Sequence, residues 1–334
     1  MIRGDKKLYL DEHRLTALPE SVVDLRDLEE LHVDANALTA LPASIGKLKK
    51  LIRLNVQHNK ITSLPKELWQ LTNLQILSVG ENPLNSLSES IGNLVKLTQL
   101  YVHSINAASL PESIGNLTNL HTLDLGHNAL TSLPESLGNL RRLVFLYLSD
   151  NRLASLPTTL LENLSDLAYI GVTDNLLTSL PVTIGNLTNL IELRLYNNKL
   201  SSLPESIGNL VKLRELHLMN NKLVALPASL GRLTDLKELR LLNNSLTALP
   251  ESIGNLRSLA HLDLRNNKLA ALPESLGNLK SLTHLDLRAN KLLSLPESVG
   301  ELPRLEKLDL RWNKLSSYPQ WLHHLKQRGC LVYN

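Results

Sequence analysis

The sequence predicts an α/β solenoid of about fourteen turns, with a parallel β-sheet on its concave side and irregular or 3-10 returns on its convex side. Two observations carry this prediction. The pattern LxxLxLxxNxLxxLPxxIGxL recurs along the 334 residues and is seen cleanly at 117–140. Its asparagine recurs every 23 residues, with a single step of 24 that ends at Asn175.

Each turn contains a short LxL strand, whose two leucines point to the same side of the sheet and are expected to be buried. The asparagine that follows is expected to bond the backbone of the bend, because stacked neighbours leave those groups unpaired. Twelve turns have an asparagine at this position of the repeat: Asn36, Asn59, Asn82, Asn128, Asn151, Asn175, Asn198, Asn221, Asn244, Asn267, Asn290 and Asn313. The same step places His13 and Ile105 in the two remaining turns.

The return of each turn carries the proline of LPES and the glycine of SIGN. Proline fixes φ and glycine tolerates unusual φ, so we expect a tight return without a long helix. The domain organisation follows from the pattern. Residues 1–318 form the solenoid, and residues 319–334 form a C-terminal cap of the same domain, in which Trp321, Leu322 and Leu325 cover the open core.

This repeat resembles the leucine-rich repeat proteins of the 23-residue LPxxIGxL class over nearly the whole chain. That class includes intracellular Ras-group-related repeat scaffolds and many bacterial proteins, effectors among them. The resemblance implies protein recognition on the concave face, and the partner stays open. The function expected from it is that of a signalling scaffold or interaction module, or of the recognition part of a bacterial effector.

Charge and composition exclude several other classes. The 35 basic and 32 acidic residues give a net charge of +3, too even for a nucleic-acid binder. No stretch reaches the ~18 apolar residues of a membrane helix, so we expect no membrane insertion. Cys330 is the single cysteine, which excludes an intrachain disulfide and indicates a reducing compartment. We therefore expect a cytoplasmic monomer without cofactor, or a protein delivered to a host cytosol.

No catalytic motif such as GxxxxGKS/T, GxSxG, HExxH or CxxC occurs in the sequence, so an enzyme is not expected. Some bacterial effectors with similar repeats are ubiquitin ligases that use a cysteine in a separate domain. Only four residues follow Cys330, which favours packing in the cap over catalysis. The spacing of His103, His121, Asp124 and His127 does not match a compact ligand set, so no metal is expected.

The outward strand positions are free of the packing constraint and vary from turn to turn. Five of the eight Phe and Tyr residues fall on them in the central turns, with methionine, leucine and arginine beside them, which is the composition of binding hot spots. The alternative is that β-propensity alone favours aromatics on strands. The predicted partner-binding residues are Tyr101, His103, Phe145, Tyr147, Tyr169, Arg194, Tyr196, His217, Met219, Arg240 and Leu242. Gly126 and Gly171 are expected to leave gaps for a partner side chain.

A charged pattern occupies the last turns. Three aspartates and three arginines stand in adjacent columns there: Asp263, Asp286 and Asp309 beside Arg265, Arg288 and Arg311. Two interpretations stay open, a self-paired solvated face or a surface that orients a charged partner. Trp312 closes this zone as a candidate second anchor.

The pattern breaks in turns four and five, at Pro83, Ser88 and Ile105, where a local change of shape is expected. The extra residue of turn seven, within 157–164, is expected on the convex side. For the ligand, the sequence favours a protein bound by the central aromatic and arginine residues. A glycan or other non-protein ligand on the same tyrosine and histidine surface is the alternative.

Overall fold

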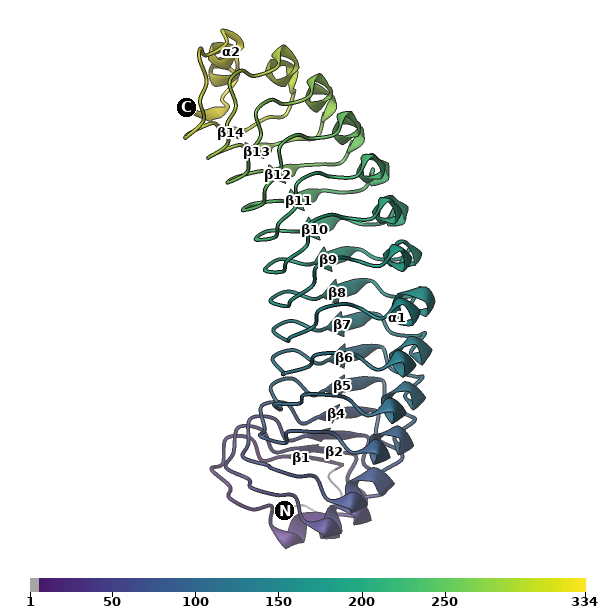
Figure 1. The fold of residues 1–334 in the computed structure, drawn as a ribbon. Coiled ribbons are helices and arrows are strands. Elements are labelled where there is room, and N and C mark those ends of the chain that lie inside the picture. The colour runs from purple at the N-terminus through teal and green to yellow at the C-terminus, as the bar shows by residue number, and fades with distance from the viewer. Residues whose placement is uncertain (1–5) are drawn as a thin grey trace. The chain divides into compact units, whose positions relative to one another are not determined.

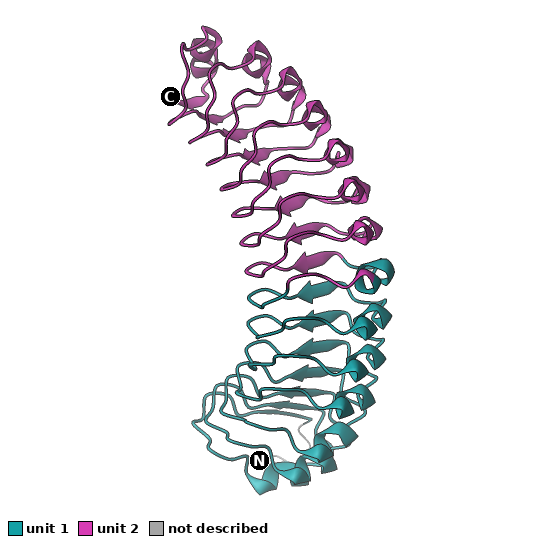
Figure 2. Ribbon diagram, viewed as in Figure 1, with its two compact units in different colours: residues 1–153, 159–167 teal, residues 154–158, 168–334 magenta. Residues whose placement is uncertain are grey.

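The computed structural model describes residues 6–334, which divide into two compact units. Unit 1 comprises residues 1–153 and 159–167, of which 1–5 lie outside the described residues, and unit 2 comprises residues 154–158 and 168–334 (Figure 2). Within each unit, turns stack one on the next, with the strands on one side and the short helices on the other (Figure 1).

The strands are three residues long and run parallel to their neighbours within each unit. Unit 1 holds β1 Lys7–Tyr9, β2 Glu30–His32, β3 Arg53–Asn55, β4 Ile76–Ser78, β5 Gln99–Tyr101, β6 Thr122–Asp124 and β7 Phe145–Tyr147. Unit 2 holds β8 Tyr169–Gly171, β9 Glu192–Arg194, β10 Glu215–His217, β11 Glu238–Arg240, β12 His261–Asp263, β13 His284–Asp286, β14 Lys307–Asp309 and β15 Leu331–Tyr333.

The returns are single turns of 3-10 helix, as the short LPxxIGxL segment predicts. In the first half of the chain these are η1 Glu20–Asp24, η2 Ala43–Lys47, η3 Lys66–Gln70, η4 Glu89–Asn93, η5 Glu112–Asn116 and η6 Glu135–Asn139. The second half has η7 Val182–Asn186, η8 Glu205–Asn209, η9 Ala228–Arg232, η10 Glu251–Asn255, η11 Glu274–Asn278 and η12 Glu297–Glu301. The two α-helices are α1 Thr158–Asn163, in the segment with the extra residue, and α2 Trp321–Gln327.

Strand register confirms the alternation read from the sequence. Leu216 of β10 pairs with Leu193 and Leu239 of its neighbours, and all three leucines are fully buried. The outward residues follow the same register: His217 pairs with Arg194 on one side and with Arg240 on the other. A shift of one residue would expose the leucines, so burial fixes the register of every strand.

The asparagines form the expected ladder. The Nδ2 atom of Asn221 donates to the carbonyl oxygens of Leu195, Leu218 and Met219, and its Oδ1 accepts from the backbone amide of Leu200. One buried side chain thus satisfies backbone groups of two turns, at places where the short strands provide no partner. The other asparagines of the frame repeat this arrangement, as Asn267 shows.

The glycines of the returns are required for a different reason from the one expected. Among the described glycines only Gly329 has a positive φ, so the return glycines do not serve an unusual backbone conformation. At Gly254, an added Cβ would lie 2.3 Å from the carbonyl oxygen of Ser275 in the next return. The absence of a side chain therefore lets successive 3-10 helices pack closely.

The break in turns four and five is local, as expected. Ile105 is fully buried in the asparagine position and cannot accept a hydrogen bond from the preceding turn. The amide of Leu84 instead bonds the carbonyl of Asn82, and Asn85 and Asn106 adopt positive φ. Ser88 replaces the usual proline and caps η4 by accepting a hydrogen bond from Ser90 N.

The C-terminal segment leaves the repeat pattern and forms helix α2. Trp321, Leu322 and Leu325 of α2 are buried. The sequence analysis did not predict that the chain then adds strand β15, whose Val332 pairs with Leu308 of β14.

Candidate functional site

The side chains free to meet a ligand stand chiefly at two outward positions of each turn. We call this side of each unit the strand face. The first position is the last residue of each strand, and the second follows two residues later. The residue that begins each strand, such as Phe145 or Tyr169, points to the same side. Because the strands are in register, equivalent residues of neighbouring turns form columns.

Six of the predicted partner-binding residues lie on the strand face of unit 2 and remain at least partly exposed. These residues, the unit 2 patch, are Tyr169, Arg194, Tyr196, Met219, Arg240 and Leu242. Arg194 is held in place from two sides: its Nε forms an ion pair with Glu192, and its guanidinium carbon lies 5.7 Å from the centre of the Tyr169 ring. Arg240 forms the equivalent ion pair with Glu238.

His217 differs from the expectation of an exposed contact residue. It is only 7% exposed, with Nε2 3.1 Å from Glu215 Oε2 and Nδ1 3.9 Å from Glu238 Oε1. Burial between two carboxylates makes His217 a bridge between strands β10 and β11. A partner would meet the neighbouring side chains of the patch instead.

The remaining predicted residues, Tyr101, His103, Phe145 and Tyr147, lie on the strand face of unit 1. Phe145 is 41% exposed. His103 Nδ1 lies 3.3 Å from Asp124 Oδ2, and Nε2 lies 3.6 Å from Glu81 Oε1. The Asp124 contact and the two carboxylate charges raise the pKa of His103 against the opposing effect of burial.

The two glycines expected to leave gaps behave differently. A Cβ on Gly171 would lie 2.7 Å from the Tyr169 hydroxyl, so the tyrosine side chain already covers that position. The gap expected at Gly171 is therefore closed. At Gly126 the nearest atoms to an added Cβ are Asp124 Oδ1 at 3.3 Å and the carbonyl oxygen of Ser149 at 3.5 Å, so this position is less crowded than Gly171.

The charged columns of the last turns pair with each other. Arg265, Arg288 and Arg311 each place Nη2 2.6 Å from the aspartate two residues earlier, and Nε lies 2.9 Å from the same carboxylate. Cross-strand contacts of 3.5 Å and 3.4 Å link Arg265 to Asp286 and Arg288 to Asp309. We call these six residues the Asp–Arg ladder, and its geometry favours the self-paired interpretation. Trp312, 70% exposed, lies outside the strands with a positive φ.

A hollow of about 250 Å³ adjoins Arg240 on the strand face of unit 2. His261 and His284 line it, with ring centres 4.7 Å apart. Burial, and then the neighbouring His261, lower the pKa of His284. The two histidines pair across β12 and β13, and their rings lie side by side at an angle of 35°.

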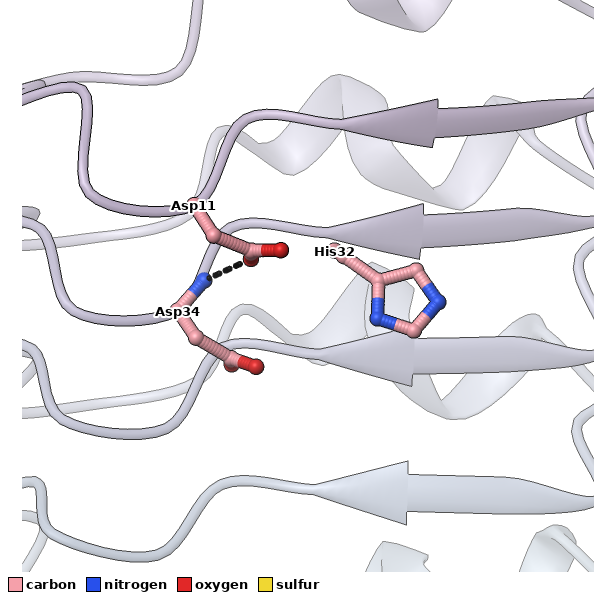
Figure 3. A group of neighbouring side chains, drawn as sticks. All are labelled: Asp11, His32 and Asp34. Atoms are coloured by element: carbon pink, nitrogen blue, oxygen red, sulfur yellow. Dashed lines mark hydrogen bonds between the residues drawn. The ribbon is translucent and has the colours of Figure 1, made fainter.

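Two groups of side chains bring three potential metal ligands together in the described chain. Each holds one ligand atom per residue within 4.8 Å of the others. One group is Glu192, Glu215 and His217. The other, the N-terminal cluster, is Asp11, His32 and Asp34 (Figure 3). Of the residues that the sequence analysis weighed as ligands, His103 contacts Asp124, and His127 Nδ1 lies 2.9 Å from Asp150 Oδ2.

Asp34 is the most perturbed carboxyl of the N-terminal cluster. Burial, followed by the charge of Asp11, raises its pKa to about 6. Asp11 Oδ1 accepts a hydrogen bond of 2.7 Å from the backbone amide of Asp34, which fixes the two carboxylates side by side (Figure 3). The His32 ring stacks on Tyr9 with ring centres 4.7 Å apart.

Cys330 is 5% exposed, and its amide bonds the carbonyl of Leu325 in α2. Burial raises the pKa of its thiol, which disfavours the reactive thiolate. Its environment is that of a packing residue in the cap. No helix within residues 6–334 has the length and apolar character needed to cross a bilayer.

Comparison with known proteins agrees with the repeat geometry. The family model for the leucine-rich repeat region matches residues 6–100, 81–168, 151–246 and 228–331. A leucine-rich repeat protein of Leptospira interrogans is 32% identical with a TM-score of 0.82, and the alignment covers 99% of this chain and 96% of that one. Comparison with curated proteins gives no significant match.

Two further solved structures are similar. A plant peptide hormone receptor, solved in complex with its peptide RGF2, is 32% identical with a TM-score of 0.81 over 96% of this chain and 54% of the receptor. An internalin from Listeria monocytogenes is 25% identical with a TM-score of 0.78 over 94% of this chain and 87% of the internalin. The family match over nearly all described residues and the agreement in fold lead to one conclusion: the chain belongs to the leucine-rich repeat family.

Proposed function

We propose that this protein is a recognition module that binds a protein or peptide on its strand face, chiefly through the unit 2 patch. The observation that carries the proposal is the composition of that patch. Tyrosine, arginine, methionine and leucine side chains stand together on consecutive strands at positions that packing does not dictate. Such residues dominate the binding energy of protein interfaces.

Preorganisation supports the same proposal. The backbone of the patch belongs to short strands fixed by buried leucines, and Arg194 is held between Glu192 and Tyr169. Side chains already ordered lose little entropy on binding. His217 acts behind this surface, where it links Glu215 and Glu238. Tyr101, His103, Phe145 and Tyr147 provide a corresponding contact surface on unit 1.

The complex of the plant receptor with its peptide is a second support, because it shows a similar fold engaged by a polypeptide ligand. We further propose that the protein acts as a monomer in a reducing, cytosolic compartment without catalytic activity. The buried free thiol of Cys330 is compatible with that location.

The test is quantitative crosslinking capture from source-cell lysate with wild-type protein and two matched variants. The patch variant carries Tyr196→Ala, Met219→Ala and Leu242→Ala. The control variant carries Val182→Ala, Val211→Ala and Val224→Ala, three exposed apolar residues of unit 2 outside its strands. Both variants must retain the wild-type circular dichroism spectrum.

We expect a set of proteins captured by wild type and control and reduced at least tenfold with the patch variant, the effect of losing a hot spot. Equal capture by all three proteins would refute the assignment of the patch. Capture that is abolished by removing glycans from the lysate would favour the glycan alternative over a polypeptide ligand.

A further inference from the structure

The N-terminal cluster lies in unit 1, in the first two turns, and is separate from the unit 2 patch. Asp11 and Asp34 occupy the second outward position of consecutive turns, and His32 occupies the first position of the second turn. Their ligand atoms lie within 4.8 Å of one another. Figure 3 shows the two carboxylates side by side with the imidazole ring facing them.

The cluster carries negative charge without a strong counter-charge. Within residues 6–334, no lysine or arginine forms an ion pair with Asp11 or Asp34; the nearest such pair is that of Lys7 with Glu30. The other three-ligand group differs on this point, because Arg194 forms an ion pair with Glu192. Glu238, which also faces His217, is paired with Arg240. The N-terminal cluster therefore lacks the arginine ion pairs that neutralise the carboxylates around His217.

The imidazole is oriented for metal binding. His32 Nε2 lies 3.5 Å from Glu30 Oε2, which leaves Nδ1 as the atom available to a cation. Glu30 is itself held by Lys7, with 2.8 Å between Nζ and Oε1. A histidine that ligates through one nitrogen and contacts a carboxylate through the other is the usual arrangement at protein metal sites. Stacking on Tyr9 further restricts the ring.

An unsatisfied atom beside the cluster is an independent sign of a missing ligand. Asn55 pairs with His32 across β2 and β3, and its Nδ2 donates to Asp34 Oδ2. Its Oδ1 is buried and has no hydrogen-bond partner. A buried acceptor without a partner is rare in native proteins and calls for a bound group. Water on a cation held by Asp34 would supply the missing donor.

We propose that Asp11, His32 and Asp34 bind a divalent transition-metal ion, for which Zn²⁺ is the probe. One imidazole and two carboxylates suit Zn²⁺, whereas Ca²⁺ and Mg²⁺ prefer oxygen ligands alone. Three protein ligands leave the fourth tetrahedral position to water. The ligand atoms of a tetrahedral zinc site are about 3.4 Å from one another. The distances between the ligand atoms of the cluster must therefore shorten by roughly 1.4 Å at most, and rotation of the two aspartate side chains allows this.

The test is isothermal titration of the chelator-treated full-length protein with ZnCl2. We expect one tight site, at least tenfold weaker in Asp11→Asn and in His32→Gln. Asp11→Asn retains an oxygen that can accept the Asp34 amide, so it preserves the local fold. His103→Gln is the matched control, because His103 also lies between two carboxylates on the strand face of unit 1.

Unchanged zinc affinity in both cluster variants would overturn the proposal, as would an equal loss in His103→Gln. Tighter binding of Ca²⁺ than of Zn²⁺ would also overturn it, because it would exclude the imidazole as a ligand. If one cluster variant fails to fold, the ¹H signal of His32 in wild-type protein decides. A shift that saturates at one equivalent of Zn²⁺ supports the site, and an unshifted signal refutes it.

Discussion

The N-terminal cluster and the Asp–Arg ladder both place carboxylates at outward positions of the same repeat, the ladder at the first position and the cluster at the second, with opposite results. In the ladder, each aspartate pairs with the arginine two residues later, and Asp286 and Asp309 also contact the arginine of the preceding turn. In the cluster, Asp34 has Asp11 beside it and only His32 opposite. The comparison teaches that the backbone of the repeat tolerates either pattern. The outward residues alone decide whether the charged side chains of a surface pair with each other or remain available to a ligand.

The largest effect is expected from breaking the ladder. Replacing Arg288 by methionine leaves the 1% exposed Asp309 and also Asp286 with one ion-pair partner each instead of two. We expect a loss of about 2 kcal/mol in the free energy of unfolding, because a buried carboxylate loses compensation. Urea unfolding at pH 7 measures this. An unchanged midpoint would show that the ladder is only a solvated surface.

Removing a charge from the cluster should have the opposite sign. In chelator-treated protein, Asp11→Asn relieves the repulsion of Asp34 while an amide oxygen still accepts the Asp34 amide. We expect stability at pH 7 to rise by about 1 kcal/mol, because the repulsion of Asp11 helps to raise the pKa of Asp34. The pKa of Asp34, measured by NMR titration, should fall from about 6. A destabilised variant with an unaltered Asp34 pKa would contradict this account.

His103 offers an intermediate case, in which a titratable cation lies between two carboxylates. Its pKa is raised in the folded protein, so its contribution is fully present below the ordinary histidine pKa and is lost as pH rises through the folded value. The stability difference between wild type and His103→Gln should be about 1 kcal/mol at pH 6 and smaller at pH 9. Parallel stability curves from pH 6 to 9 would show that His103 is never charged.

The smallest effect is expected where both partners are fully in solvent. Lys50 and Asp27 form an ion pair of 2.6 Å, but their side chains are 63% and 76% exposed. Water and salt screen such a pair, so Asp27→Asn should leave the thermal midpoint unchanged. A clear decrease of the thermal midpoint would mean that fully exposed ion pairs stabilise this repeat. Burial would then not explain the difference between the cluster and the ladder.

The repetition in the sequence explains why most of the fold could be predicted. Each leucine and asparagine of the repeat pattern occurs many times. The strand register, the asparagine ladder and the returns of all turns could therefore be predicted from the pattern of one turn. The cap helix followed from the apolar spacing of Trp321, Leu322 and Leu325. Strand β15 escaped prediction because its three residues carry no repeat pattern.

The exposure of the site residues was harder to predict, because it depends on side-chain conformations that the aligned repeats do not reveal. His217 is buried by its two glutamates, and Tyr169 folds over Gly171. The N-terminal cluster was visible in principle. Asp11 and Asp34 stand in one column with His32 beside them. The sequence shows no arginine two residues after either aspartate, whereas each aspartate of the ladder has one.

Because the Asp–Arg ladder pairs with itself, our proposal assigns polypeptide binding in unit 2 to the unit 2 patch, and this is the central claim. Hydroxyl-radical footprinting of the protein with a partner recovered by capture tests it most directly. We predict that oxidation of Tyr196 and Met219 falls severalfold in the complex, while that of the exposed Trp312 beside the ladder stays unchanged. Protection of Trp312 with unchanged oxidation of Tyr196 and Met219 would contradict the claim and place the interface on the ladder.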